Sequence, residues 1–132
     1  MIGLDTNVLV RLLVADDAVQ TRRAVRFVAQ HCTPEVPGFI NIIVLVELVW
    51  VLGSAYAYRP VQIADALERL IAGADRVTEH HDQVRTSLAD YRAGRGDFVD
   101  ILIGHVNRAQ GCEATATFAR KATRLGTFRS VG

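Results

Sequence analysis

Four acidic residues are the strongest candidates for chemistry in this chain: Asp5, Glu47, Asp97 and Asp100. Clustered carboxylates repel one another and raise one another's pKa values unless a cation neutralises them. Oxygen ligands without histidine or cysteine favour Mg²⁺ or Mn²⁺ over zinc. A metal ion held in this way lowers the pKa of a bound water and offsets charge that develops on a phosphate. If the fold brings the four residues together, they predict hydrolysis or transfer at a phosphodiester.

Each of these residues also has a purely structural explanation. Asp5 ends a short apolar run and could merely cap the helix expected after it. Glu47 lies among apolar neighbours, where a lone carboxylate is costly unless it binds a metal or pairs with an arginine at the helix edge. Asp97 and Asp100 share one face of an expected helix start, where acids commonly lie. The four together make a better case for a metal site than any one of them alone.

Short apolar segments alternate along the chain with longer segments of helical periodicity. Strands are expected at 2–4, 38–40, 76–78, 114–118 and about 127–128. Helices are expected at about 6–13, 16–32, 42–56, 60–73, 82–93 and 97–110, with a short one ending at 125. This alternation is typical of an α/β fold in which helices cover both faces of a parallel sheet.

The first strand is expected to pass into the first helix at Asp5. In α/β folds, ligands and catalytic groups gather just beyond the carboxyl ends of the strands. Thr6 and Asn7 offer N-cap chemistry for the helix that follows, and Asn41 does so for the helix at 42–56. That second helix is apolar almost all round, which predicts that it packs between neighbouring elements.

The composition indicates one soluble domain over residues 1–132. Half of the residues are hydrophobic, which argues against disorder, and the formal net charge is only +1. Two cysteines without metal-like spacing, Cys32 and Cys112, suggest two buried thiols in a reducing compartment. No secretory leader is visible, and the longest apolar run, 39–52, is too short to span a membrane. We therefore expect a cytoplasmic protein.

Positive charge gathers toward the end of the chain. From residue 102 onward only Glu113 is acidic, against these basic residues: Arg108, Arg120, Lys121, Arg124 and Arg129. Such a cluster fits contact with a polyanion or an acidic partner, although a modest cluster is more often a solvated surface.

Taken in order, these motifs resemble those of PIN-domain ribonucleases, and in particular the VapC toxins of bacterial toxin–antitoxin pairs. The resemblance rests on four segments: 4–9 (LDTNVL), 44–48 (VLVEL), 97–103 (DFVDILI) and 116–118 (ATF) with 120–122 (RKA) behind it. Each segment alone is a loose match. Four of them in the expected order and spacing, in so short a chain, are fairly specific.

The resemblance implies a three-layer α/β/α sandwich in which helices flank a short parallel sheet. It implies a hydrolase, an endoribonuclease that cleaves RNA with Mg²⁺ or Mn²⁺. It also implies a homodimer that a small VapB-type antitoxin neutralises.

Carried over motif by motif, the resemblance assigns three groups of residues. The acidic site positions are Asp5, Glu47 and Asp100, with Asp5 and Asp100 as metal ligands and Asp97 as a close auxiliary. The polar residues that would surround them are Thr6, Asn7 and Thr117. The basic residues that would contact RNA phosphate or an antitoxin are Arg120, Lys121 and Arg124.

The chain departs from the family pattern at Ala119, where an aspartate usually follows Thr-Phe. The surrounding motif is otherwise intact, which fits a single substitution of an active-site aspartate. We expect this change to reduce metal occupancy and to slow cleavage.

Two other functions fit parts of the sequence. With Ala119 the domain could hold RNA or a partner protein without cutting, and binding that persists without divalent metal would distinguish this case. A phosphatase with Asp5 as nucleophile is disfavoured, because haloacid-dehalogenase-type enzymes need a second aspartate where this chain has Asn7.

Overall fold

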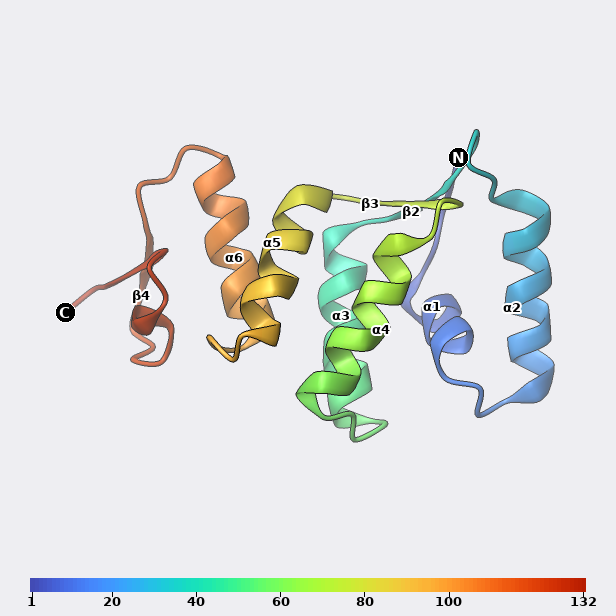
Figure 1. Ribbon diagram of the computed structural model, residues 1–132, viewed down its shortest axis with the longest axis horizontal. Helices are drawn as coiled ribbons and strands as arrows, with labels where there is room; N and C mark the ends of the chain where they lie inside the picture. The colour runs from blue at the N-terminus through green and yellow to red at the C-terminus, as the bar shows by residue number, and fades with distance from the viewer. The chain divides into compact units, whose positions relative to one another are not determined.

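The computed structural model describes all of residues 1–132. The chain divides into two compact units, unit 1 over Met1–Glu79 and unit 2 over His80–Gly132. Figure 1 colours the chain from blue to red, so unit 1 runs from blue to green and unit 2 from yellow to red. Each unit is described by itself.

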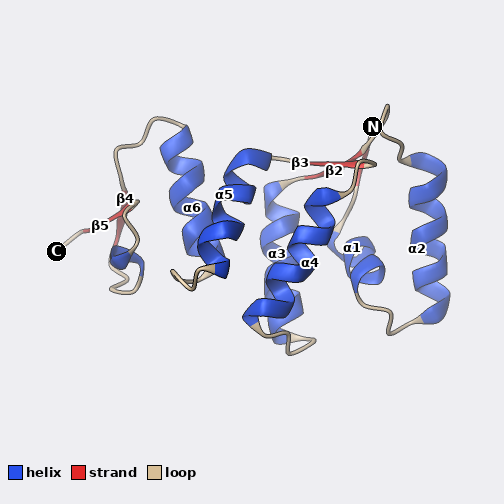
Figure 2. Cartoon of the chain, viewed as in Figure 1, coloured by secondary structure: helices blue, strands red, loops and turns tan.

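Unit 1 alternates strands with helices around a small sheet (Figure 2). Its elements are β1 (Ile2–Gly3), α1 (Thr6–Leu13), α2 (Ala18–His31), β2 (Gly38–Ile40), α3 (Ile42–Ser54), α4 (Pro60–Ala72) and β3 (Arg76–Thr78). The strands pair in parallel in the order β1-β2-β3, with Ile2 opposite Gly38 and Gly38 opposite Arg76. Parallel pairing directs the carboxyl ends of all three strands to the same edge of the sheet.

The core of unit 1 is aliphatic. Apolar side chains at helical spacing on α1, α3 and α4 are fully buried, and they include Leu9, Leu45, Leu48, Leu52 and Leu67. This burial, rather than helix propensity, holds helices as short as α1 in place.

A polar cluster fixes the end of α1. Asp16 accepts hydrogen bonds from the Arg11 guanidinium and from the Tyr56 hydroxyl, the latter at 3.1 Å. Partial burial alone would raise the pKa of Asp16, but the hydrogen bonds from Tyr56 and Arg11 outweigh it and lower that pKa below its ordinary value. The cluster therefore ties the α1–α2 turn to the segment after α3.

Unit 2 contains two packed helices followed by a second parallel pair of strands. Its elements are α5 (His81–Arg92), α6 (Phe98–Ala109), β4 (Thr115–Thr117), the 3₁₀ turn η1 (Ala122–Arg124) and β5 (Phe128–Ser130). Val84 and Leu88 of α5 are buried, as are Phe98 and Ile101 of α6. Across the same helix pair, the His105 ring lies 2.8 Å from the Asp90 carboxylate.

The α/β class and the order of the elements agree with the sequence analysis, with three corrections. Asp5 has the N-cap role considered for it, so the N-cap of α1 is neither Thr6 nor Asn7. The short helix expected before 125 is a single 3₁₀ turn. The third helix is not covered on all sides, because Ile43 is 76% exposed and Trp50 is 69% exposed. That residues 1–132 form one domain stays a prediction.

Two further observations bear on the expectations from composition. Both cysteines are free thiols, and Cys32 is buried as expected, but the expectation that Cys112 is buried is wrong, because it is exposed. No helix has the length and apolar character needed to cross a bilayer.

Gly104 tests how tightly α6 packs on the end of unit 2. A Cβ at this buried position would lie 2.1 Å from Thr127 Oγ1, which is an overlap. Gly104→Ala should lower the free energy of unfolding by about 1–3 kcal/mol through overpacking. Urea denaturation followed by circular dichroism measures the change.

The matched control is Gly53→Ala in α3, where a Cβ would meet only Ile63 Cδ1 at 3.8 Å. This variant should keep or raise the stability by up to about 1 kcal/mol, because alanine is the better helix former. Equal effects from the two substitutions would contradict the packing described for Gly104.

Candidate metal site at the carboxyl ends of the strands

Asp5 lies just after β1, at the edge of the sheet where the three parallel strands of unit 1 end. Its Oδ1 accepts a hydrogen bond from the Thr6 backbone N–H at 2.7 Å and so begins α1. One carboxylate oxygen is therefore used in capping, and the side chain is exposed. The capping role and a metal-binding role are compatible, because a second oxygen is left over.

The Thr6 side chain is an unusual neighbour of this carboxylate. Thr6 is buried, and its Oγ1 has no hydrogen-bond partner. A buried hydroxyl without a partner is costly and indicates a missing water, ion or ligand. Asn7, the other residue of the expected polar shell, is exposed and lines a groove between α1 and α2.

The other two strands of unit 1 also end in polar residues. Asn41 follows β2 and its Oδ1 accepts from Val44 N–H at 2.8 Å, which confirms the expected N-cap of α3. Glu79 follows β3 and its Oε1 accepts from Ile42 N–H at 2.8 Å. The sequence analysis missed Glu79, because its partner is 37 residues away and no local pattern connects them.

Glu47 lies in the second turn of α3, which begins at the same edge of the sheet. Its side chain is exposed, beside the exposed Ile43 and Trp50. The expectation that Glu47 is surrounded by apolar side chains is therefore wrong, because this side of α3 is open. The alternative, an ion pair with an arginine, is not formed either. Glu47 is free to take a ligand at little desolvation cost.

Asp97 and Asp100 lie together at the start of α6, as their spacing predicts. Asp97 Oδ1 accepts from the backbone N–H groups of Val99 at 3.0 Å and Asp100 at 3.2 Å. Partial burial raises the pKa of Asp100, and the nearby charge of Asp97 raises it further. The pair therefore carries the conflict between like charges that a cation would relieve.

Helix α6 runs antiparallel to β4 (Figure 1). This arrangement determines which end of β4 lies near Asp97 and Asp100. Asn107, near the end of α6, donates to Thr115 Oγ1 at 3.0 Å, at the start of β4. The residue before Asp97 lies at the opposite end, where a Cβ on Gly96 would meet Leu125 at 3.4 Å. The two aspartates and the carboxyl end of β4 therefore belong to the same end of unit 2.

Ala119 follows the carboxyl end of β4, the position that corresponds to Asp5 after β1. Its backbone N–H donates to Thr117 Oγ1 at 3.0 Å, so Thr117 fixes the turn that holds residue 119. Within either unit, no group of three or more His, Cys, Asp or Glu side chains could hold a metal ion. In unit 2 an aspartate at 119 would add a third acid at the end where two already lie.

The basic residues expected beside the site all lie around η1. Arg120, Lys121 and Arg124 are exposed, as is Phe118. An exposed aromatic side chain next to three cations is typical of surfaces that bind single-stranded nucleic acid.

The residues present fit a hard divalent cation. The candidate ligands are carboxylate oxygens, and Mg²⁺ is commonly held by one or two carboxylates together with waters and substrate phosphates. The Thr6 hydroxyl, next in sequence to Asp5, is buried without a partner, and burial together with the charge of Asp97 raises the pKa of Asp100. Asp5 and Glu47 belong to unit 1, while Asp97 and Asp100 belong to unit 2.

The raised pKa of Asp100 gives a test of the charge conflict. Asp97→Asn should lower that pKa without restoring its ordinary value, because desolvation is the larger cause. Asparagine caps helices as well as aspartate does, so α6 should remain folded. Carboxyl-carbon NMR titration measures the change, and Asp82→Asn in α5 is the control, which should leave Asp100 unaffected.

The raised pKa of Asp100 also determines how its contribution to the folding stability changes with pH. A carboxyl whose pKa is higher in the folded state opposes folding once ionised, so its contribution falls as the pH rises through the folded-state pKa. Asp97→Asn should weaken this dependence. An unchanged titration of Asp100 in that variant would show that Asp97 is not its electrostatic neighbour.

The chain can be compared with protein-family models, with curated proteins and with solved structures. A family model described as the PIN domain matches residues 2–126. Neither a search of curated proteins nor a search of solved structures found a match to this chain. PIN domains are generally metal-dependent nucleases that bind RNA, and they typically use divalent metal ions. Since the match spans nearly the whole length and runs through both units, the chain belongs to the PIN-domain family.

Proposed function

We propose that this chain is a metal-dependent endoribonuclease of the VapC toxin type, weakened by Ala119. The proposal is supported by the PIN-family match together with the acidic residues that follow β1 and begin α6. It extends the family assignment in three respects: the toxin role, Mg²⁺ or Mn²⁺ as the metal, and the residues that act.

Asp5 and Asp100 are proposed to hold the metal, and Glu47 to hold the metal or its water. A bound Mg²⁺ or Mn²⁺ supplies an activated water and neutralises charge on the phosphate. Asp97 keeps α6 capped and adds negative charge beside Asp100. Thr6 and Asn7 begin the helix that carries Asp5, and Thr117 holds the turn at Ala119.

Arg120, Lys121 and Arg124 are proposed to contact phosphate groups of RNA. The same cations would suit acidic groups of a VapB-type antitoxin, which would then compete with substrate for this surface. We also propose that the protein acts in the cytoplasm as a homodimer, on the strength of its resemblance to VapC toxins.

Ala119→Asp tests the proposal. Restoring a carboxylate at the end of unit 2 that holds Asp97 and Asp100 should increase metal affinity and raise RNA cleavage about tenfold to a hundredfold, as expected for one ligand-shell residue. Cleavage of a mixed RNA pool should be measured with Mg²⁺, with Mn²⁺ and with EDTA, for the native chain and the variant.

Two controls sharpen this experiment. Ala116→Asp places the same charge on the exposed middle of β4 and should leave cleavage unchanged. Asp5→Asn or Asp100→Asn, each added to the Ala119→Asp chain, should abolish the gain. If the Ala119→Asp chain cleaves no faster than the native chain with either metal, the role assigned to residue 119 is wrong.

A second function is favoured by the exposed Phe118 beside the basic residues of η1. With Ala119 in place, the domain would bind single-stranded RNA or an acidic protein without cutting. This second function would be recognised by RNA binding that persists in EDTA and weakens steeply as the salt concentration rises. No cleavage would follow when metal is added. Arg120→Gln and Arg124→Gln should then weaken binding.

A further inference from the structure

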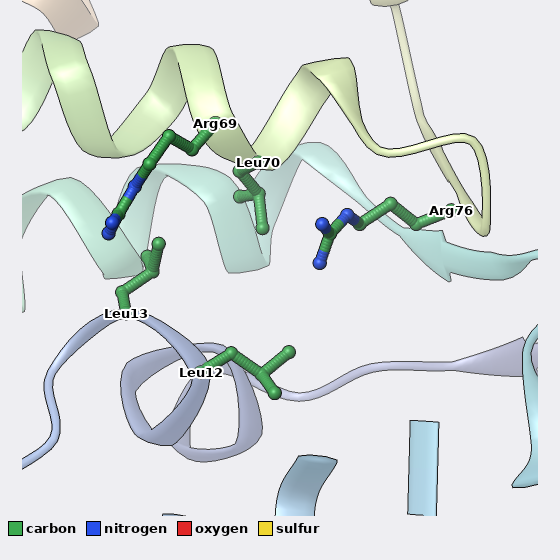
Figure 3. Close-up of a pocket in the computed structure, with 5 residues that line it drawn as sticks. All are labelled: Leu12, Leu13, Arg69, Leu70 and Arg76. Atoms are coloured by element: carbon green, nitrogen blue, oxygen red, sulfur yellow. The ribbon is translucent and has the colours of Figure 1, made fainter. Parts of the chain in front are cut away.

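A pocket of about 220 Å³ lies within unit 1, away from the acidic residues described above. Its lining consists of Leu12 and Leu13 from α1, Arg69 and Leu70 from α4, and Arg76 from β3. Figure 3 shows Arg69 reaching from α4 toward Leu13 of α1 and Arg76 extending toward Leu70, which lies between the two guanidinium groups. The pocket therefore has an apolar floor of three leucines and two arginines at its rim, one of which, Arg76, also pairs with Asp75.

The cations of this pocket are poorly satisfied by the protein. Arg76 Nε is shielded from water and has no hydrogen-bond acceptor. The nearest carboxylate oxygen, Asp75 Oδ1, is 3.5 Å away. Arg69 has neither an ion pair nor a hydrogen bond. Arg76 Nε, shielded from water and only distantly paired with Asp75, would gain a hydrogen-bond acceptor from a bound anion, and the exposed Arg69 adds positive charge.

The Arg76 side chain lies close against the backbone of Gly73. Its side chain passes over Gly73 so closely that a Cβ there would lie 2.2 Å from Arg76 Nε. Gly73 has ordinary backbone angles, with φ −68° and ψ 126°, so a Cβ here would displace the end of the Arg76 side chain without straining the backbone.

The pocket lies at the opposite end of the sheet from the candidate metal site. Arg76 is the first residue of β3 and pairs in register with Gly38, the first residue of β2. Asp5, Asn41 and Glu79 all follow the strands at their carboxyl ends. A ligand here would therefore be separate from an RNA substrate at those carboxylates.

The volume limits the ligand. A space of 220 Å³ holds about seven water molecules, and it is smaller than the pockets of roughly 300–1,000 Å³ that enclose drug-sized ligands. We propose that this pocket binds a small amphipathic anion, in which a carboxylate or phosphate group bonded by Arg69 and Arg76 is joined to a short apolar chain lying against the leucines.

Isothermal titration calorimetry on the full chain tests this proposal with defined probes. Hexanoate and hexyl phosphate should bind saturably, and the stronger of the two identifies the head group. Hexanol, hexylamine and inorganic phosphate should bind at least tenfold more weakly, because each lacks either the anion or the apolar chain. Equal binding of hexylamine or of inorganic phosphate would overturn the proposal, as would the absence of saturable binding by both acids.

Three variants of pocket residues and one control variant show where the acid binds. Arg69→Gln and Arg76→Gln should each weaken the better acid at least tenfold, whereas Arg22→Gln, which removes an exposed cation of α2, should not. Gly73→Ala keeps both charges but displaces Arg76, and it should weaken binding while the chain stays folded by circular dichroism. Binding unaffected by all three pocket variants would place the acid elsewhere and refute the assignment.

Discussion

The need to satisfy the free N–H groups at helix N-termini governs where this chain places its acids. The first turn of every helix leaves backbone donors without partners. Here α1, α3 and α6 are each capped by a polar side chain: Asp5, Asn41 and Asp97 respectively. In α1 and α3 the cap directly follows a parallel strand. Two of the residues proposed for the site, Asp5 and Asp97, thus also begin helices.

This overlap explains why a capping role never excludes a catalytic one. Capping uses a single oxygen of Asp5 or of Asp97 and holds the side chain in a fixed orientation. Residue 119 lies after a strand in the same way, but alanine offers no oxygen. What unit 2 keeps at that position is the turn, held by Thr117.

The sequence predicted local features well and long-range ones poorly. Asn41 was identified as a cap because its N-cap chemistry acts on residues three positions ahead. Glu79 was missed because it caps α3 from a neighbouring strand, which only tertiary structure brings close. The apolar sequence of α3 indicated cover on all sides, but composition cannot say which faces have neighbours, and Ile43 and Trp50 are exposed. The metal roles of Asp5, Glu47 and Asp100 rest on motif order and stay predictions.

The two cysteines differ in exposure, so their rates of chemical modification can report local opening of the structure. Cys112 is exposed in the turn between α6 and β4, whereas Cys32 is buried directly after α2. A thiol reagent should modify the first at once and reach the second only when unit 1 opens. The delay between the two modifications therefore measures how often unit 1 opens locally. A fluorophore attached to Cys112 alone reports on unit 2.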